Sequence, residues 1–406
     1  MSEPRTGSGS ATRPIRVCLV APSLSILGGQ AVAAQRLLER LRVVPGLEVD
    51  FLPHDPRTNA LLRQLQRVKY VRTVATSIAY VASLLRRLPQ YDVVHVFSAS
   101  YWSFLLAPTP AILIGKWLGK RVVVNYRSGE AEDHLTRWPT AVSTLQRADA
   151  VATPSGYLVD VFARFGIRAE SIANFVDPGA VRHRRRDVLR PVFLSNRNFQ
   201  GLYNVPCVLR AFAQIQAQRP DARLIVVGDG PERERVHALA RELALRNVEF
   251  VGAVQPTEMG RYYDEADVYL NASDIDNMPN SIIESFACGL PVVTTRAGGI
   301  PYIVEHERNG LLVDCGDHAA LADAALRLLG DPALARRVID EGLSDVQRLY
   351  TWEAVGDGWA ALYRRLVGAE ARTAEAQSAG APRATQASDE EERHAPATLI
   401  GEASIQ

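Results

Sequence analysis

Apolar runs that alternate with helical patterns constrain the fold of this chain more than any other feature. The first run covers residues 15–20 (IRVCLV), and after a turn with two glycines, Ala33, Leu37 and Leu41 recur at helical spacing. Further runs of this kind occupy residues 93–97, 121–124, 150–153, 192–195, 224–228, 248–252, 268–271 and 291–295. Strands that alternate with helices favour a parallel sheet with crossover helices, so we expect an α/β protein.

The alternation is interrupted once, by the basic stretch 181–187 (VRHRRRD), and it starts again at residue 192. A length of 406 residues is enough for two domains. We therefore predict two tandem, doubly wound, Rossmann-like domains, residues 14–187 and 188–350, that face each other across a cleft. Ligands of such sheets bind at the carboxyl ends of the strands, so functional residues are expected in the loops that follow strands.

Composition and charge exclude several classes of protein. Apolar residues at 47% and charged residues at 22% are typical of a globular protein, and a formal net charge of +1 gives no overall attraction to nucleic acid. The chain has four cysteines, Cys18, Cys207, Cys288 and Cys315. Their spacing fits neither a zinc site nor a disulfide framework. Residues 1–13 lack the apolar centre of a secretory signal, and residues 368–406 contain no aromatic residue, so we expect a cytoplasmic protein with disordered ends at 1–13 and 368–406.

Two glycine-containing loops follow predicted strands and are candidate anion-binding sites. Gly28 and Gly29 precede the first predicted helix, where backbone amides can approach an anion, although a tight turn accounts for this pair equally well. The second loop, residues 228–231 (GDGP), has two of the three glycines of a dinucleotide-binding fingerprint, and Arg233 occupies the third position. A simple NAD site is therefore disfavoured.

The segment 273–293 (SDIDNMPNSIIESFACGLPVV) is the most informative part of the sequence. Pro279 suits the first position of a helix and Gly289 the residue past its last turn, so we predict a short helix between them. Asp276 then lies in the preceding loop and Glu284 within the helix, whose side chains lean toward its N-terminus. Both carboxylates would enter one cleft and accept hydrogen bonds from a hydroxyl-rich ligand.

Each of these carboxylates also has a purely structural role open to it. Asp276 could cap the helix, and Glu284 could be a partly buried carboxylate paired with an arginine. Asp274 and Asp276 also match the acidic triplet that holds a divalent metal in some sugar transferases, where oxygen ligands suit Mg or Mn. That metal site belongs to a different, single-domain architecture, so we expect no metal here.

The segment resembles the E-x7-E region of glycosyltransferase family 4, retaining enzymes of the GT-B fold that move a sugar from a nucleotide donor. Asp276 and Glu284 have the spacing of that region. The resemblance also covers residues 28–29 (GG), 92–95 (DVVH), 227–232 (VGDGPE), 250–252 (FVG), 266–268 (ADV) and 287–293 (ACGLPVV). It extends over residues 15–366 and is strongest after residue 192.

The resemblance implies where a nucleotide-sugar donor binds. The C-terminal domain would hold the nucleoside diphosphate, with Glu284 on the ribose hydroxyls and Arg197 on the diphosphate. The other expected donor-binding residues are Gly28, Gly29, Gly228, Gly252, Asp276, Asn277, Met278, Pro279 and Asn280. The loop 276–280 would face the hexose. The N-terminal domain would bind the acceptor, a helix at 351–367 would cross back to brace that domain, and no metal or other cofactor would be needed.

The chain departs from the family pattern at three positions. Asp276 replaces the first glutamate, and Tyr203 stands where a lysine for the diphosphate is expected. Arg127 replaces the histidine of the N-terminal domain, and His134 is the nearest imidazole.

The expected catalytic residues are Asp276, Arg197, His134 and Arg127. Arg233 or Arg296 could assist Arg197 on the diphosphate, and Glu130 could complete the sugar pocket together with His134. The alternative for His134 is a solvent-facing histidine without a role in the reaction.

The leading interpretation is a retaining glycosyltransferase that moves a hexose to a hydroxyl of a glycan, a lipid-linked acceptor or a small molecule. Two alternatives remain: a nucleotide-sugar epimerase or phosphorylase on a similar fold, and a degenerate nucleotide-sugar-binding subunit. The basic amphipathic stretch 63–87 could rest on an anionic membrane, although a packed crossover helix with a basic rim accounts for this pattern as well.

Overall fold

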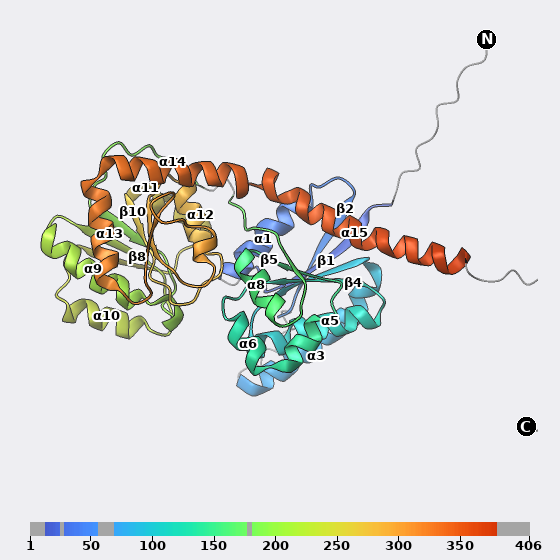
Figure 1. Cartoon of the computed structure of the whole chain (residues 1–406). Coiled ribbons are helices and arrows are strands. Elements are labelled where there is room, and N and C mark those ends of the chain that lie inside the picture. Colours follow the sequence, from blue (N-terminus) through green and yellow to red (C-terminus); the bar gives the residue numbers. More distant parts are fainter. Residues whose placement is uncertain (1–12, 25–27, 56–68, 177–180, 380–406) are drawn as a thin grey trace, which may run out of the picture. The chain divides into compact units, whose positions relative to one another are not determined.

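The computed structural model describes residues 13–24, 28–55, 69–176 and 181–379. The described chain contains two six-stranded sheets whose strands pair in parallel, with helices packed on them (Figure 1). The predicted fold, two tandem doubly wound α/β domains, is confirmed. Both sheets belong to one compact unit that ends at Val367.

The first sheet has the strand order β2-β1-β3-β4-β5-β6. Its strands are β1 (Ile15–Ala21), β2 (Leu47–Pro53), β3 (Val93–Ser98), β4 (Arg121–Tyr126), β5 (Ala150–Thr153) and β6 (Ala169–Ser171). The helices of this half are α1 (Gly29–Leu41), α3 (Lys69–Arg87), α4 (Tyr101–Leu106), α5 (Pro108–Trp117), α6 (Ala131–Arg137), α7 (Pro139–Leu145) and α8 (Gly156–Arg164). The order in which the chain adds strands reverses between β1 and β3, although the two strands are parallel. A doubly wound sheet opens a ligand-binding crevice at such a reversal point.

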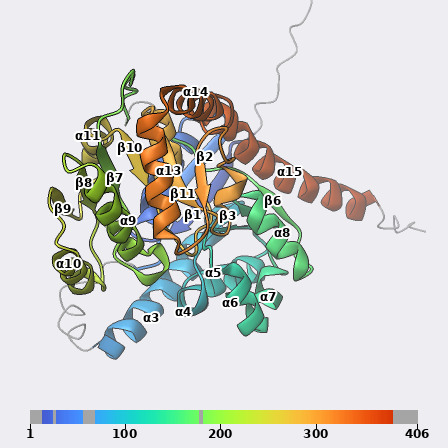
Figure 2. The ribbon, with the colours of Figure 1, turned by 60° about the vertical axis from the view of Figure 1, so that its left-hand side comes forward.

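The second sheet has the order β12-β11-β10-β7-β8-β9, and its reversal lies between β7 and β10. Its strands are β7 (Val192–Ser195), β8 (Arg223–Val227), β9 (Val248–Gly252), β10 (Val268–Leu270), β11 (Val292–Thr295) and β12 (Leu311–Val313). The helices are α9 (Val205–Gln218), α10 (Arg233–Glu242), α11 (Met259–Glu265), α12 (Asn280–Ala287), α13 (His318–Gly330), α14 (Pro332–Leu349) and α15 (Trp352–Ala379). Helices α9 and α13 lie side by side on one face of this sheet (Figure 2), and α12 belongs to a separate apolar cluster.

Helix α15 returns to the first sheet. Trp359, Leu362 and Tyr363 are buried in the same apolar cluster as residues of β1 and α1. The hydroxyl of Tyr363 lies 2.6 Å from Nδ1 of the buried His95 on β3. Where the chain crosses from the first half to the second, the backbone N–H of Val176 donates to the carbonyl of Tyr350 at 2.8 Å, so the two crossings meet at one place.

The predicted disordered ends fall mostly outside the described residues. Residues 1–12 and 380–406 are not described, whereas residues 368–379 continue α15 instead of starting a disordered tail. This difference has a local cause, because residues 369–379 include five alanines and two glutamates, which favour helix, and they contain no proline or glycine.

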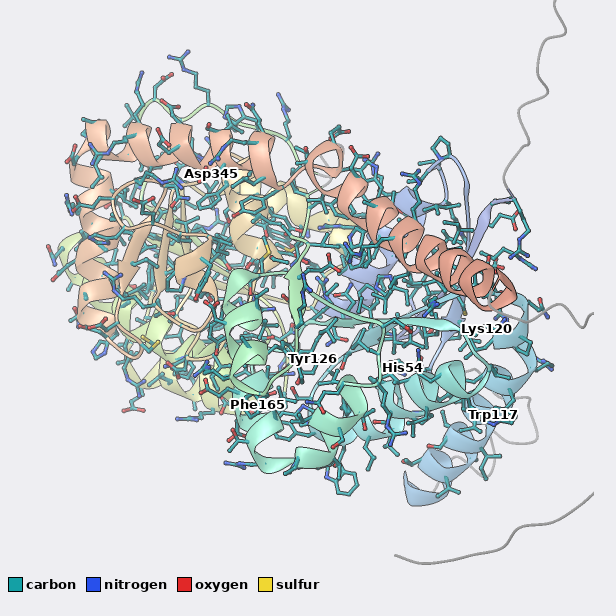
Figure 3. All side chains as sticks on the ribbon, turned by 45° about the vertical axis from the view of Figure 1, so that its right-hand side comes forward. His54, Trp117, Lys120, Tyr126, Phe165 and Asp345 are labelled. Atoms are coloured by element: carbon teal, nitrogen blue, oxygen red, sulfur yellow. The ribbon has the colours of Figure 1, made fainter. Side chains whose placement is uncertain are left out.

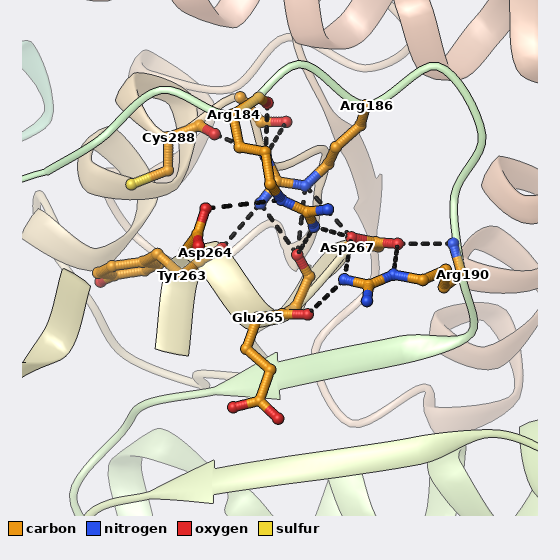
Figure 4. Close-up of polar contacts among 10 residues, drawn as sticks. Arg184, Arg186, Arg190, Tyr263, Asp264, Glu265, Asp267 and Cys288 are labelled. Carbon is orange, nitrogen blue, oxygen red and sulfur yellow. Dashed lines mark hydrogen bonds and ion pairs between the residues drawn. The ribbon is translucent and has the colours of Figure 1, made fainter. Parts of the chain in front are cut away.

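The basic stretch 181–187, at the predicted domain boundary, makes hydrogen bonds and ion pairs with the second domain. The guanidinium of Arg186 donates to the carbonyls of Cys288 at 2.6 Å and Tyr263 at 2.7 Å. Arg184, Arg186 and Arg190 converge on the carboxylate of Asp267, whose side chain is 1% exposed (Figure 4). Arg190 makes three of the contacts, from its backbone N–H at 2.6 Å, from Nε at 2.9 Å and from Nη2 at 3.2 Å.

Candidate functional site

A cavity of about 1060 Å³ opens at the carboxyl ends of the strands of both sheets. Its walls come from the loops after β1, β3 and β4 in the first half and after β7, β8, β9 and β10 in the second. The loops after β1 and β3, and those after β7 and β10, flank the reversal points of the two sheets. The sequence predicts the site in these loops. Ten of the expected catalytic or donor-binding residues contribute to its walls: Gly28, Gly29, Arg127, Arg197, Gly228, Asp276, Met278, Pro279, Asn280 and Glu284.

Arg197 and Asp276 form an ion pair at the reversal point of the second sheet. Nη2 of Arg197, just after β7, donates to Oδ2 of Asp276 in the loop after β10, and both side chains are almost buried. The guanidinium lies over the ring of Tyr203, with its central carbon 3.9 Å from the ring centroid. Burial alone would lower the pKa of Arg197, but the neighbouring Asp276 carboxylate raises it above its ordinary value. The tyrosine at the expected lysine position therefore provides a ring face for this arginine.

Glu284 is paired across the cavity with an arginine of the first half. Nη1 of Arg36 on α1 lies 2.9 Å from Oε1 of Glu284, and the hydroxyl of Tyr263 donates to Oε2 at 2.7 Å. Asn196 donates to the same tyrosine hydroxyl at 2.7 Å. The sequence left open an arginine partner for Glu284, and the structure identifies it as Arg36.

The helix that carries Glu284 begins one residue later than predicted. Pro279 is the N-cap of α12, with φ −67° and ψ 121°, and not its first helical residue. Gly289 follows the C-cap with φ +69°, as expected for a residue past the last turn. Asp276 does not cap α12 with its side chain, because its carboxylate is taken by Arg197 and by the backbone N–H of Asn277 at 2.9 Å.

Asn277 was expected to contact the donor, but the structure does not place it on the cavity wall. Ser155 donates its hydroxyl to Oδ1 of Asn277, and Nδ2 of Asn277 donates to the carbonyl of Arg127 at 3.4 Å. These partners belong to the first half, so the side chain connects the two halves. Arg127 itself faces the cavity and donates to Oδ1 of Asn174. Burial lowers the pKa of Arg127 to about 10.

His134 lies behind the cavity wall, neither on the wall nor in solvent. It is buried, and its Nδ1 is 2.8 Å from the hydroxyl of Tyr126. Its ring packs against those of Tyr101 and Phe104, with centroids 5.2 Å away in both cases. Burial lowers the pKa of His134 to about 4, so the ring is neutral at pH 7. Within this aromatic group, Tyr101 contributes to the cavity wall and His134 does not. Glu130 is also a wall residue.

One expected glycine and two arginines considered for the diphosphate do not contribute to the cavity wall. Gly252, the last residue of β9, is not on the cavity wall, but Ala253 and the residue after it are. Arg233 pairs with Asp229 at 2.9 Å and Arg296 with Asp314 at 3.6 Å, and neither arginine reaches the wall.

Two glycines that were not predicted to matter position the Asp276 loop. A Cβ on Gly298 would lie 2.2 Å from the carbonyl oxygen of Asp276, and one on Gly299 would lie 2.1 Å from that of Asn277. The backbone N–H of Gly299 also donates to the Asp276 carbonyl at 3.0 Å. The signal was present in the sequence, because two adjacent glycines in the loop after a predicted strand indicate a close backbone approach.

The acidic triplet does not converge on one point. Asn204 donates to both oxygens of Asp274, at 3.0 and 3.2 Å, while Asp276 is bound to Arg197. Within the described residues no group of three His, Cys, Asp or Glu side chains is placed to hold a metal ion.

Two parallel sheets with one cavity at their carboxyl ends, lined by an arginine and two carboxylates, are the architecture expected of the GT-B fold. Two family models match the two halves: Glycosyltransferase Family 4 over residues 27–180 and Glycosyl transferases group 1 over residues 191–331. The chain belongs to this family of glycosyltransferases.

Relatives with named activities match mainly a part of the chain. The lipopolysaccharide core biosynthesis glycosyltransferase LpsD of Rhizobium meliloti is 32% identical over 174 residues, which are 43% of this chain and 47% of LpsD. A D-inositol 3-phosphate glycosyltransferase of Corynebacterium jeikeium is 34% identical over 175 residues, 41% of this chain and 42% of that protein. These matches span about half the length of the relatives.

Solved structures share the fold over most of the chain. Sucrose-phosphate synthase from Thermosynechococcus elongatus superposes with a TM-score of 0.69 at 23% identity, covering 87% of this chain and all of that one. HepE from Anabaena, solved in complex with UDP-glucose, also gives 0.69, at 18% identity, covering 86% of this chain and 99% of HepE.

Proposed function

We propose that the protein transfers a hexose from a nucleoside-diphosphate sugar to an acceptor hydroxyl, with retention at the anomeric carbon. One observation carries this proposal: Arg197, Asp276 and Glu284 face a single cavity at the carboxyl ends of both sheets. A buried guanidinium supplies bidentate donors for a diphosphate, and carboxylates accept hydrogen bonds from sugar hydroxyls.

The donor is proposed to bind mainly through the second half. Glu284 accepts from the ribose hydroxyls, Arg197 binds the diphosphate, and Asp276 accepts from the hexose. Gly28 and Gly29 add backbone amides at the start of α1, which no side chain caps. One relative, from Corynebacterium glutamicum, is named as a GDP-mannose-dependent mannosyltransferase, and HepE was solved in complex with UDP-glucose, so we propose a GDP-sugar or a UDP-sugar as the donor.

In the proposed reaction, the bond between the anomeric carbon and the diphosphate oxygen breaks, and the acceptor oxygen bonds to the same face of that carbon. The departing diphosphate takes the proton of the acceptor hydroxyl. Arg197 stabilises the negative charge that develops on the diphosphate. Arg127 stays protonated at pH 7 and therefore orients hydroxyls without acting as a base.

We expect a nucleoside diphosphate to bind without a divalent cation, because Arg197 and the α1 amides face the position proposed for the phosphates. Calorimetry with UDP and GDP in excess EDTA measures this directly. If binding is lost in EDTA and returns with Mg or Mn, the acidic triplet at Asp274 holds a metal after all.

Product analysis with the donor, with and without acceptor, separates the alternatives. Transfer to the acceptor supports the proposal, and isomerisation of the donor sugar supports an epimerase. Donor binding with neither transfer nor hydrolysis supports a degenerate binding subunit. The names of the relatives favour neither of the last two.

For the location of the protein in the cell, we propose that its first half contacts an anionic membrane. Residues 56–129 carry eleven Lys or Arg and one acidic residue, Asp92; of these cations, Arg127 faces the cavity, and Lys116 and Arg121 pair with Asp149. Helices α3, α4 and α5 expose eight large apolar side chains: Val74, Ile78, Leu85, Trp102, Leu105, Leu106, Leu113 and Trp117. Figure 3 shows Trp117 and Lys120 at the end of α5. Within the described residues no helix is long and apolar enough to span a bilayer. Arg63 and Arg67 of the basic stretch lie outside the described residues.

Vesicle binding tests this contact. We expect the protein to sediment with phosphatidylglycerol vesicles and not with phosphatidylcholine vesicles, and added salt should weaken binding. Trp117→Asp should reduce the bound fraction severalfold. The control Val188→Asp alters an exposed apolar residue of the other half and should leave binding unchanged. Equal binding to both lipids, or equal loss in both variants, would contradict the proposal.

A further inference from the structure

The cations on the cavity wall differ in what holds them. Three described cationic residues contribute to the wall, and all are arginines: Arg36, Arg127 and Arg197. Arg127 is held by Asn174 of its own half, and Arg197 by Asp276 of the second half. Arg36 differs from both, because it reaches from the first half to the carboxylate of Glu284 in the second.

Arg36 shares a helix face with the predicted anion-binding turn. Gly29, Val32 and Arg36 are spaced i, i+3 and i+7 on α1, and all three contribute to the cavity wall. Side chains on a helix lean toward its N-terminus, so the long Arg36 side chain leans toward the α1 amides. The Arg36 guanidinium and the backbone amides at the start of α1 both attract an anion, so one negatively charged ligand can bind to both.

Arg36 and the ribose hydroxyls would compete for the same oxygen of Glu284. Tyr263 already donates to Oε2, which leaves Oε1, the oxygen beside Arg36, as the better acceptor for ribose hydroxyls. The Arg36 side chain is only 16% exposed. Removing its carboxylate partner without a replacement leaves a charge in a poorly hydrated position, which is unfavourable. A ligand with both a diol and a phosphate supplies hydroxyls for Glu284 and a new anion for Arg36.

We propose that Arg36 is a diphosphate-binding residue that Glu284 holds in the absence of donor, and that it exchanges this partner for the diphosphate when the ribose engages Glu284. The proposal rests on the proposed function, because it assigns the ribose to Glu284. Arg36 then provides a phosphate-binding cation in a chain that has tyrosine at the expected lysine position. The exchange predicts that the phosphates of a nucleotide strongly raise its affinity for the protein. It also predicts that the nucleoside alone binds poorly, because it would leave Arg36 without an anion.

Calorimetry with UDP, GDP, uridine and guanosine on the full chain tests the exchange. In Arg36→Ala we expect nucleoside-diphosphate affinity to fall about ten- to a hundredfold, the usual effect of losing a hydrogen bond to a charged group. Nucleoside affinity should stay the same or rise, because Glu284 is then free. Arg36→Lys should retain most of the diphosphate affinity. Arg40→Ala, one turn further along α1 and not on the cavity wall, is the matched control and should behave as wild type.

The possible outcomes are distinct. If diphosphate and nucleoside affinities change by the same factor in the same direction, Arg36 acts only as a partner of Glu284 and the proposal is overturned. If the wild type binds neither UDP nor GDP, the proposed function fails instead. Thermal unfolding shows whether Arg36→Ala folds, and if it does not, Arg36→Gln asks the same question, because it keeps a donor for Glu284 and removes the charge.

Discussion

Arg197→Ala should lower the turnover number for transfer about a hundred- to a thousandfold, the usual cost of removing a donor that stabilises charge developing in a transition state. Its guanidinium is almost buried and aimed into the cavity, where the departing diphosphate is proposed to lie. Steady-state kinetics with the donor sugar and an active acceptor measure this loss. Donor hydrolysis is the substitute readout until the acceptor is known.

Two further variants separate charge stabilisation from support of Asp276. Arg197→Lys keeps the charge but loses the planar fork, so it should recover only part of the rate. Asp276→Asn removes the partner and keeps Arg197. If Arg197→Ala and the double variant have the same rate as Asp276→Asn alone, Arg197 acts only by holding Asp276, and its assignment to the diphosphate is wrong.

Asp267→Ala should destabilise the protein by about 3–5 kcal/mol, because it removes a buried carboxylate shared by three arginines and leaves the fully buried Arg186 without a counter-charge. Urea unfolding followed by tryptophan fluorescence measures the change. Asp221→Ala breaks an exposed pair with Arg219 and is the matched control, with no change expected. A midpoint equal to that of the wild type would show that the cluster in Figure 4 contributes little to stability.

The same cluster makes stability depend on acid. Burial would raise the pKa of Asp267, but hydrogen bonds from Arg190 and Arg184 hold it below its ordinary value. A carboxyl group whose pKa is lower in the folded state stabilises the fold above its unfolded pKa of about 3.9, and this contribution is lost as pH falls through the folded value. Unfolding curves between pH 6 and pH 2 should therefore converge for wild type and Asp267→Asn at the acid end.

The fold was predictable because most buried strands of both sheets are uninterrupted apolar runs, which are easy to find in sequence. The edge strands β2, β6 and β12 were not predicted: β6 and β12 have only three residues each, and in β2 charged residues interrupt the apolar pattern. Cavity residues were predictable where they directly follow a strand, as Arg197 and Gly228 do, because the parallel topology fixes where such loops meet.

The partners of the site residues were not predictable in the same way. Arg36 and Glu284 are far apart in the sequence, and no local pattern connects them. The burial of His134 did leave a signal that was not used, because Ala131, His134 and Leu135 occupy one face of α6 at helical spacing. Asn277 was misplaced because its neighbours are cavity residues, while its own side chain is bound by Ser155 from the other half.

The meeting of the two chain crossings at Val176 and Tyr350 has a mechanical consequence. Phe175 packs against Trp352 beside this point, with ring centroids 5.2 Å apart. If the two halves turned about this point as a pivot, each atom would shift in proportion to its distance from it, so Phe175 and Trp352 would move least and the far walls of the cavity most. A bulky substitution or a cross-link at the pivot would therefore limit the opening of the site without touching any residue that meets the sugar.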